Sequence, residues 1–353
     1  MPLIVDGGRI PTRWAERQSL RPTGSIDSYD TRAECMKIAF INNMPDAALE
    51  DTESQFFELL ETAADAFPVH IKLYSLPKIP RSDRAQQHLS KFYFGIDDLW
   101  NSRFDGVIMT GTEPRQPNLR EEPYWDTLAD VLDWAEENTA SAVLSCLAAH
   151  AGVLHSDGIS RHPLADKHFG VFDEGKVSDH VLTNGTPEPM RFPHSRWNEV
   201  REDALTACGY SVLTKSAEAG VNLFVKNRKK SLFVHFQGHP EYGAATLAKE
   251  YRRDIKRFLL RERPTYPSLP HGYFGSAAMK SLNEFRERAF SQPHEGLMAD
   301  FPEAVTSNGS ESPWHSAATR VYRNWLQYMV SKRTRIAAYA VAARSRTRVI
   351  WPR

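Results

Sequence analysis

The stretch Ala142-Val143-Leu144-Ser145-Cys146-Leu147-Ala148-Ala149-His150-Ala151-Gly152 predicts both a class of fold and a candidate nucleophile. An apolar, β-branched run ends at a cysteine, and small residues that favour a helix follow it. Such a strand-to-helix turn is typical of open α/β sheets, in which ligands bind beyond the carboxyl ends of the strands. The positive end of the helix favours a thiolate there, and its free N–H groups can hold an oxyanion. The alternative for Cys146 is a small buried side chain, as most free cysteines are.

Apolar runs of strand length recur along the chain and alternate with segments of helical spacing. This alternation predicts an α/β fold with a doubly wound, mostly parallel sheet and flanking helices. One helix should begin at a capping box formed by Thr52 and Gln55, and others should begin near Trp125 and Ala244. The predicted strands are Lys37–Ile41, Val69–Leu76, Gly106–Met109, Ala142–Ser145, Gly220–Val225 and Leu232–Phe236.

Composition divides the chain into three parts. Residues 1–35 are rich in Pro and Gly and predict an irregular arm, whereas residues 36–261 carry the α/β pattern of a catalytic domain. Residues 262–353 predict a C-terminal extension that packs on this domain, with a Pro-rich surface excursion and a helix near 277–290. From Pro313 onward the chain has nine Lys or Arg and no Asp or Glu, which predicts a solvent-facing basic helix and tail.

The overall composition removes several classes of function. Lys plus Arg and Asp plus Glu both number 44 in the 353 residues, so no net field draws the chain to nucleic acid or to anionic lipid. The three cysteines are far apart and form no CxxC pair, which argues against a disulfide framework or a metal site and favours a reducing cytoplasm. No apolar stretch is long enough for a membrane span, and no glycine-rich phosphate-binding motif occurs.

A second motif, Leu232-Phe233-Val234-His235-Phe236-Gln237-Gly238-His239-Pro240-Glu241-Tyr242, again places chemistry just beyond a strand. His239 could accept a proton from a cysteine on the same sheet edge, and Glu241 could orient the imidazole. His235 lies inside the strand pattern, so we expect it to be a core residue.

These motifs resemble the homoserine O-acyltransferases of the homoserine O-succinyltransferase type, which have a class I glutamine-amidotransferase-like fold. The resemblance also rests on Asn42-Asn43-Met44-Pro45, Thr52-Glu53-Ser54-Gln55 and Pro193-His194-Ser195-Arg196, which occur in family order. It implies transfer of succinyl from succinyl-CoA, through a cysteine thioester, to the hydroxyl of L-homoserine in methionine biosynthesis. No cofactor is implied beyond succinyl-CoA as co-substrate, and a cytoplasmic homodimer is expected.

The resemblance also implies roles for individual residues. Cys146 would carry the acyl group, His239 would be the general base and Glu241 its orienting partner. We expect an oxyanion hole made by two backbone N–H groups on either side of the site. The remaining implied positions are Lys167, Ser195 and Arg253 for substrate binding, Arg115 for acyl specificity, and Gly111 and Leu147 for the oxyanion.

Departures from the family pattern keep alternatives open. Asp46-Ala47-Ala48 stands where lysines are usual, and Arg115 replaces the Gly or Glu that accompanies succinyl or acetyl use. An acetyltransferase, or serine as the acceptor, would keep the same mechanism. A glutamine-amidotransferase-like hydrolase is disfavoured because Leu144 and Ala148 replace the glycines expected around its cysteine, and a non-catalytic binding protein is the third alternative.

Overall fold

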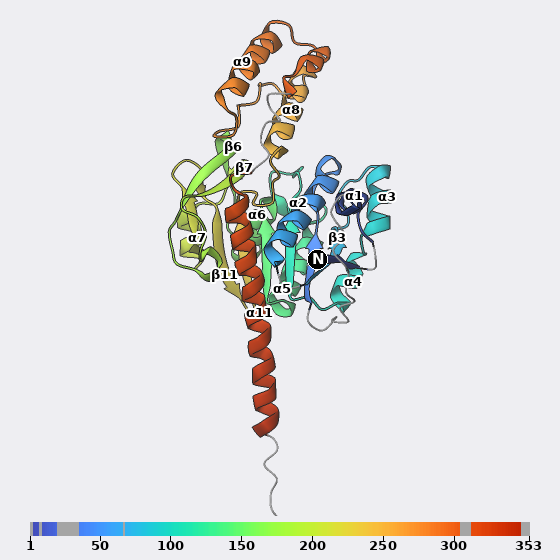
Figure 1. Cartoon of the computed structure of the whole chain (residues 1–353), viewed down its shortest axis with the longest axis vertical. Helices are drawn as coiled ribbons and strands as arrows, with labels where there is room; N and C mark the ends of the chain where they lie inside the picture. The colour runs from blue at the N-terminus through green and yellow to red at the C-terminus, as the bar shows by residue number, and fades with distance from the viewer. Residues whose placement is uncertain (1–2, 7–8, 20–34, 66–67, 304–311, 347–353) are drawn as a thin grey trace, which may run out of the picture.

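The computed structural model describes residues 3–6, 9–19, 35–65, 68–303 and 312–346 of the chain (Figure 1). Its main element is a large sheet in which the first six strands in spatial order pair in parallel and the last two antiparallel. The predicted doubly wound α/β class is therefore confirmed. In spatial order the strands are β1 (Leu3–Val5), β3 (Val69–Tyr74), β2 (Met36–Ile41), β4 (Gly106–Thr110), β5 (Ser141–Ser145), β12 (Ser231–Phe236), β11 (Leu223–Arg228) and β8 (Ser211–Val212).

Helices cover both faces of this sheet because alternate residues of each buried strand point to opposite sides. In β2, Ile38 and Phe40 pack in one core cluster, whereas Ala39 and Ile41 pack in another. The first cluster is covered by α2 (Asp46–Ala64) and α11 (His315–Arg346), and the second by α4 (Ile96–Asn101), α5 (Trp125–Asn138) and α6 (Leu147–Asp157).

The predicted start of a helix at the capping box of Thr52 and Gln55 is wrong. The helix α2 begins at Asp46, directly after Pro45, whose extended backbone keeps it outside the helix. Thr52 and Gln55 therefore lie within α2 and do not cap it, and the Gln55 amide donates a hydrogen bond to Thr246 Oγ1 at 2.8 Å.

The predicted strand Gly220–Val225 is also wrong, because Asn222 interrupts it. The chain forms β10 (Gly220–Val221) in a second sheet and β11 in the large one. The buried Asn222 between them bonds to Glu174 and to the N–H of Gly238. The second sheet is antiparallel, with spatial order β10, β9 (Thr214–Ser216), β6 (His162–Lys176) and β7 (Met190–Glu199).

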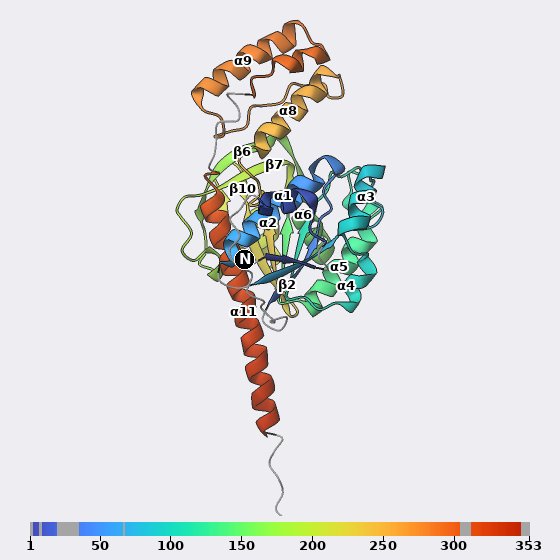
Figure 2. The same ribbon diagram turned by 45° about the vertical axis from the view of Figure 1, so that its right-hand side comes forward.

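Residues 246–303 build a lobe that stands above the carboxyl ends of the parallel strands (Figure 2). The helix α8 (Thr246–Leu259) packs there against α9 (Ser276–Ser291) and a 3₁₀ turn at Glu295–Asp300. The predicted helix near 277–290 is confirmed by α9. The surrounding segment is not only a surface excursion, since it buries side chains against α8, among them Leu282, Phe285, Leu297 and Phe301.

The described parts of both terminal segments pack on the domain more closely than expected. The predicted irregular arm contributes β1 to the sheet edge and α1 (Thr12–Ser19), whose Trp14 packs on Phe57 of α2. The predicted solvent-facing helix after Pro313 buries one face over its first four turns, where Tyr322 and Trp325 belong to the main core. Residues 20–34 of the arm and 347–353 of the tail lie outside the described residues. Among the described helices, none has the length and apolarity to cross a bilayer.

Candidate active site

Cys146 lies at the sharp turn between β5 and α6. Its backbone has φ of 53°, a left-handed conformation that non-glycine residues rarely adopt, and its N–H donates to the Phe236 carbonyl at 2.8 Å. Leu147 then begins α6, so its N–H has no partner within the helix. The turn therefore holds the thiol beside a helix N-terminus, as the sequence predicts.

Gly111, at the end of β4, faces this turn. A Cβ at position 111 would come within 2.5 Å of Leu147 Cβ and 2.9 Å of its backbone nitrogen, so only glycine allows the approach. The two residues expected to form the oxyanion hole therefore lie next to each other.

His239 and Glu241 follow β12 and reach the same sheet edge. The imidazole Nδ1 lies 2.8 Å from Glu241 Oε1, and the same carboxylate accepts from Ser145 Oγ at 3.4 Å. Burial by itself would lower the pKa of His239. The charges of Cys146 and Glu241 and side-chain hydrogen bonds with both raise that pKa well above its usual value. The structure thus brings the three predicted catalytic residues together at one sheet edge, around an imidazole whose pKa is raised.

The backbone around His239 is fixed by the second sheet. Its N–H donates to the Pro193 carbonyl of β7 at 2.8 Å, and the N–H of Gly238 donates to Asn222 Oδ1 at 2.7 Å. His235, by contrast, is buried in the core and stacks on Phe224 with ring centroids 4.7 Å apart. Burial lowers the pKa of His235 to about 3, so it stays neutral.

A cavity of about 740 Å³ opens over Cys146 and contains the predicted substrate residues. Lys167 of β6, Ser195 of β7 and Arg253 of α8 all line it. Lys167 Nζ lies 3.5 Å from Glu250 Oε2 and 3.3 Å from Asp254 Oδ2, and Ser195 Oγ donates to Glu250 Oε2.

Glu250 and Asp254 are functional candidates that the sequence reasoning missed. Burial would raise the pKa of Glu250, but the charge of Lys167 and hydrogen bonds from Ser195 and Tyr242 hold it below its usual value. The site thus contains a buried, ionised carboxylate among cations. The available signal was spacing, because Glu250, Arg253 and Asp254 share one face of the helix that follows the His239 loop.

Arg115 is the one predicted site residue that the structure leaves outside the cavity. Its side chain is exposed, and its backbone N–H donates to Glu122 Oε1 at 2.5 Å. The same carboxylate also accepts a hydrogen bond from the Gln116 N–H at 2.7 Å, so Glu122 fixes the loop through backbone N–H groups of the loop. Glu113 and Arg161 line the cavity in this region instead.

Another buried group of charges supports the cavity wall. Arg196 lines the cavity, and its guanidinium donates to the carbonyls of Asn198 and Ala219 and to His194 Nδ1. Burial lowers the pKa of Arg196 to about 10 and raises the pKa of Glu174, which contacts His194, to about 8. Each nitrogen of the Arg196 guanidinium thus makes one hydrogen bond to the wall, which fixes its positive charge beside the cavity.

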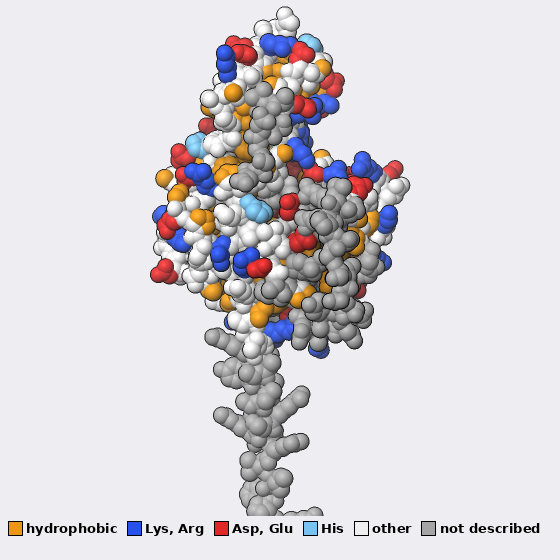
Figure 3. Space-filling view, viewed as in Figure 1, with side chains coloured by type: hydrophobic (Ala, Val, Ile, Leu, Met, Phe, Trp, Pro, Cys, Tyr) orange, Lys and Arg blue, Asp and Glu red, His pale blue; other side chains and the backbone are white. Residues whose placement is uncertain are grey.

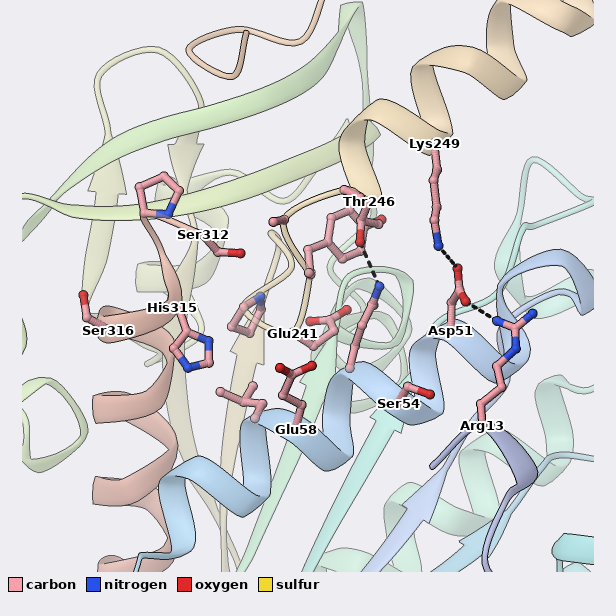
Figure 4. Close-up of a pocket in the computed structure, with 18 of the residues that line it drawn as sticks. Arg13, Asp51, Ser54, Glu58, Glu241, Thr246, Lys249, Ser312, His315 and Ser316 are labelled. Atoms are coloured by element: carbon pink, nitrogen blue, oxygen red, sulfur yellow. Dashed lines mark hydrogen bonds and ion pairs between the residues drawn. The ribbon is translucent and has the colours of Figure 1, made fainter. Parts of the chain in front are cut away.

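The reverse side of the His239 loop borders a second cavity, of about 1150 Å³, between the loop and the helices α1, α2, α8 and α11 (Figure 4). There Asp51 pairs with Lys249 at 2.7 Å and with Arg13, and these contacts fasten the start of α8 to α2. Trp314 Nε1, just before α11, donates to the Tyr242 carbonyl at 2.6 Å. The loop that carries His239 and Glu241 is thus held from both sides. No group of three or more potential metal-ligating side chains is found among the described residues.

Comparisons with known proteins agree along almost the whole chain. The family model described as homoserine O-succinyltransferase matches residues 14–336. A homoserine O-succinyltransferase of Bradyrhizobium japonicum is 43% identical over 336 residues, which cover 93% of this chain and 99% of the relative. One of Methylorubrum extorquens is 44% identical over 303 residues, covering 86% and 89%, and one of Rhodopseudomonas palustris is 42% identical over 300 residues, covering 85% and 90%. Among solved structures, a glutamine amidotransferase from Methylobacillus flagellatus aligns with a TM-score of 0.45 at 12% identity, covering 84% of this chain and 95% of the other.

Proposed function

Because this chain belongs to the homoserine O-succinyltransferase family, we propose that it transfers a succinyl group from succinyl-CoA to the hydroxyl of L-homoserine through a thioester on Cys146. The observation that carries the residue assignment is that Cys146, His239 and Glu241 line one cavity, with His239 Nδ1 2.8 Å from Glu241 Oε1. The product would be O-succinylhomoserine, an activated precursor in methionine biosynthesis.

The first half-reaction acylates the enzyme. The Cys146 thiolate attacks the carbonyl carbon of the CoA thioester, and the N–H groups of Gly111 and Leu147 stabilise the tetrahedral oxyanion. The C–S bond to CoA then breaks, and the imidazolium of His239 gives its proton to the departing thiolate. Free CoA leaves, and His239 is left neutral beside the thioester.

The second half-reaction restores the starting ion pair. Neutral His239 removes the proton from the homoserine hydroxyl as its oxygen attacks the thioester carbonyl. The intermediate collapses by expelling the Cys146 thiolate, and the proton stays on His239. Glu241 stabilises the imidazolium at both stages and keeps Nδ1 as a donor.

The charges near Cys146 complement an amino-acid acceptor. The ionised Glu250 would bind the ammonium group of homoserine, and Lys167 and Arg253 would bind its carboxylate, Arg253 through two parallel hydrogen bonds. Ser195 would contact the substrate from β7. This polar subsite favours an amino acid over water as the acceptor, which separates a transferase from a hydrolase of the same fold.

Two arginines are candidates for the free carboxylate of the succinyl group. Arg161 lines the same cavity as Cys146, whereas the Arg115 side chain is exposed and lies outside that cavity. We therefore assign the succinyl carboxylate to Arg161 and leave Arg115 as the alternative selector.

Mass spectrometry of the intact protein tests the proposal. Mixing with succinyl-CoA, without acceptor, should add one succinyl group that is absent from Cys146→Ala and is discharged by L-homoserine. Cys35→Ser and Cys208→Ser are controls that should still be acylated. An adduct that survives Cys146→Ala would overturn the residue assignment, and discharge by water as fast as by homoserine would indicate a hydrolase. The expected homodimer stays a prediction, which light scattering after size-exclusion chromatography would test.

A further inference from the structure

The helix α8 presents a cationic surface that acyl transfer to homoserine does not need. Residues 249–263 contain seven Lys or Arg and three Asp or Glu. Lys249, Arg253 and Arg257 recur every fourth residue and therefore lie on one face of the helix. Only Arg253 is required by the homoserine subsite, so the positive charge farther along α8 remains to be explained.

The distal part of this surface borders the catalytic cavity. Arg257 and Arg263 both line the cavity, and the exposed fraction of the side chain is 40% for Arg257 and 18% for Arg263. Arg257 faces Glu113 across the mouth at 3.6 Å, and Arg263 NH1 lies 3.5 Å from Asp254 Oδ2. The Arg257–Glu113 distance is long and both side chains are solvated, so this pair is weak and an anion can replace it. On the face shown in Figure 3, charged side chains lie on both sides of the notch between the lobe of α8 and α9 and the main body.

The lining of the same cavity includes an unusual aromatic residue. Trp197 of β7 lines the cavity although half of its surface, 50%, is exposed to solvent. Its neighbours in the strand, Arg196 and Asn198, are more buried. A large exposed indole in a cavity wall is suited to stacking against a flat heterocycle.

We propose that the mouth of the cavity binds the nucleotide half of CoA, with its phosphates on Arg257 and Arg263 and its adenine on Trp197. This inference rests on the proposed function, because the thioester end of the same molecule must reach Cys146. The side chains match the two parts of this nucleotide. CoA joins a purine, which an indole can stack on, to a diphosphate and a 3′-phosphate, which arginine binds through its planar fork of donors. When CoA is absent, Glu113 partly neutralises the positive charge at the mouth. The phosphates of CoA then displace Glu113 from Arg257.

The test compares two acyl donors, succinyl-CoA and succinyl-pantetheine, which carries the same thioester without the nucleotide. Arg257→Gln should raise KM for succinyl-CoA roughly tenfold, as expected for loss of a charged hydrogen bond to phosphate, and leave kcat and the kinetics with succinyl-pantetheine unchanged. Trp197→Leu should likewise raise KM for succinyl-CoA and leave the kinetics with succinyl-pantetheine unchanged. Dephospho-CoA thioester tests whether the 3′-phosphate is among the groups bound.

Lys256→Gln is the matched control, because it removes the same charge from the same helix. Its Nζ pairs with Glu295 at 3.4 Å, in the lobe and away from the cavity lining. Equal losses in Arg257→Gln and Lys256→Gln, or equal losses with both donors, would overturn the subsite. If the wild type turns over neither donor, the acyl-transfer proposal fails. Calorimetric titration with CoA then decides the subsite separately: weaker binding to Arg257→Gln than to Lys256→Gln supports it, and equal binding overturns it.

Discussion

The ring of Tyr242 stacks on the imidazole of His239, with centroids 4.2 Å apart and planes inclined by 18°. The hydroxyl of the same tyrosine donates to Glu250 Oε1 at 2.5 Å. Tyr242 therefore contacts the proposed general base with its face and the proposed ammonium-binding carboxylate with its edge. The position of bound homoserine and the position of the base are set by one side chain.

Replacing Tyr242 by phenylalanine should separate these two contacts. The stacked ring stays, but Glu250 loses one donor and becomes less well fixed. We expect KM for homoserine to rise about three- to tenfold, in line with the loss of one hydrogen bond to a charged group, with little change in kcat. Steady-state kinetics measure both constants. Tyr210→Phe is the control, because its hydroxyl bonds to Asp157, far from the cavity lining; a fall in kcat with KM unchanged would contradict this role.

The two histidines of the second motif should behave differently. His239→Ala removes the general base and should lower kcat/KM for homoserine by roughly 10²- to 10⁴-fold while the protein stays folded. His235→Ala removes a ring stacked in the core and should cost about 2–4 kcal/mol of unfolding free energy. Denaturant titration and initial rates measure the two effects; equal losses of turnover in two folded variants would be inconsistent with this placement.

The raised pKa of His239 predicts a pH profile. His239 should stay protonated beside Cys146 through neutral pH, so acylation declines only above the usual histidine range, as pH rises through the raised pKa. The protonation of His239 also stabilises the folded protein. This contribution to the unfolding free energy is fully present below the pKa of histidine in the unfolded chain and is lost as pH rises through the raised pKa of the folded state. Glu241→Gln removes a charge that raises this pKa, so the alkaline limb of kcat/KM for succinyl-CoA should move to lower pH. A limb at the same pH in both proteins would show that another group titrates.

Acyl selectivity should depend on Arg161 more than on Arg115. We expect the wild type to favour succinyl-CoA over acetyl-CoA in kcat/KM. Arg161→Gln should lower that ratio roughly tenfold, because the succinyl carboxylate loses a charged partner. Arg115→Glu should leave the ratio nearly unchanged, since its side chain is exposed. A wild type that prefers acetyl-CoA would refute the succinyl assignment, and a large effect of Arg115→Glu alone would restore Arg115 as the selector.

The local patterns of the sequence predicted the central parallel strands of the sheet and the candidate catalytic residues at its edge. The apolar run before Cys146 and the run before His239 each predict a strand, and both strands end at one edge because the sheet is parallel there. Their pairing register places Phe236 opposite Ser145. The residues that follow the two strands, Cys146 and His239, are therefore brought to the same edge of the sheet. Burial periodicity and turn residues are properties of short segments, and a single sequence displays them directly.

Only the tertiary structure decided the rest of the site. Glu250 meets Lys167 across 83 positions of the chain, and the meeting depends on β6 and β7, whose mixed polar pattern gave no strand signal. The exposed direction of Arg115 follows from the carboxylate of Glu122, which holds the loop by its backbone. The sequence by itself therefore determined the central parallel strands and the turns at which the candidate nucleophile and base lie. Ion pairs and loop directions depend on distances between segments that are remote in the chain, and folding alone brings those segments together.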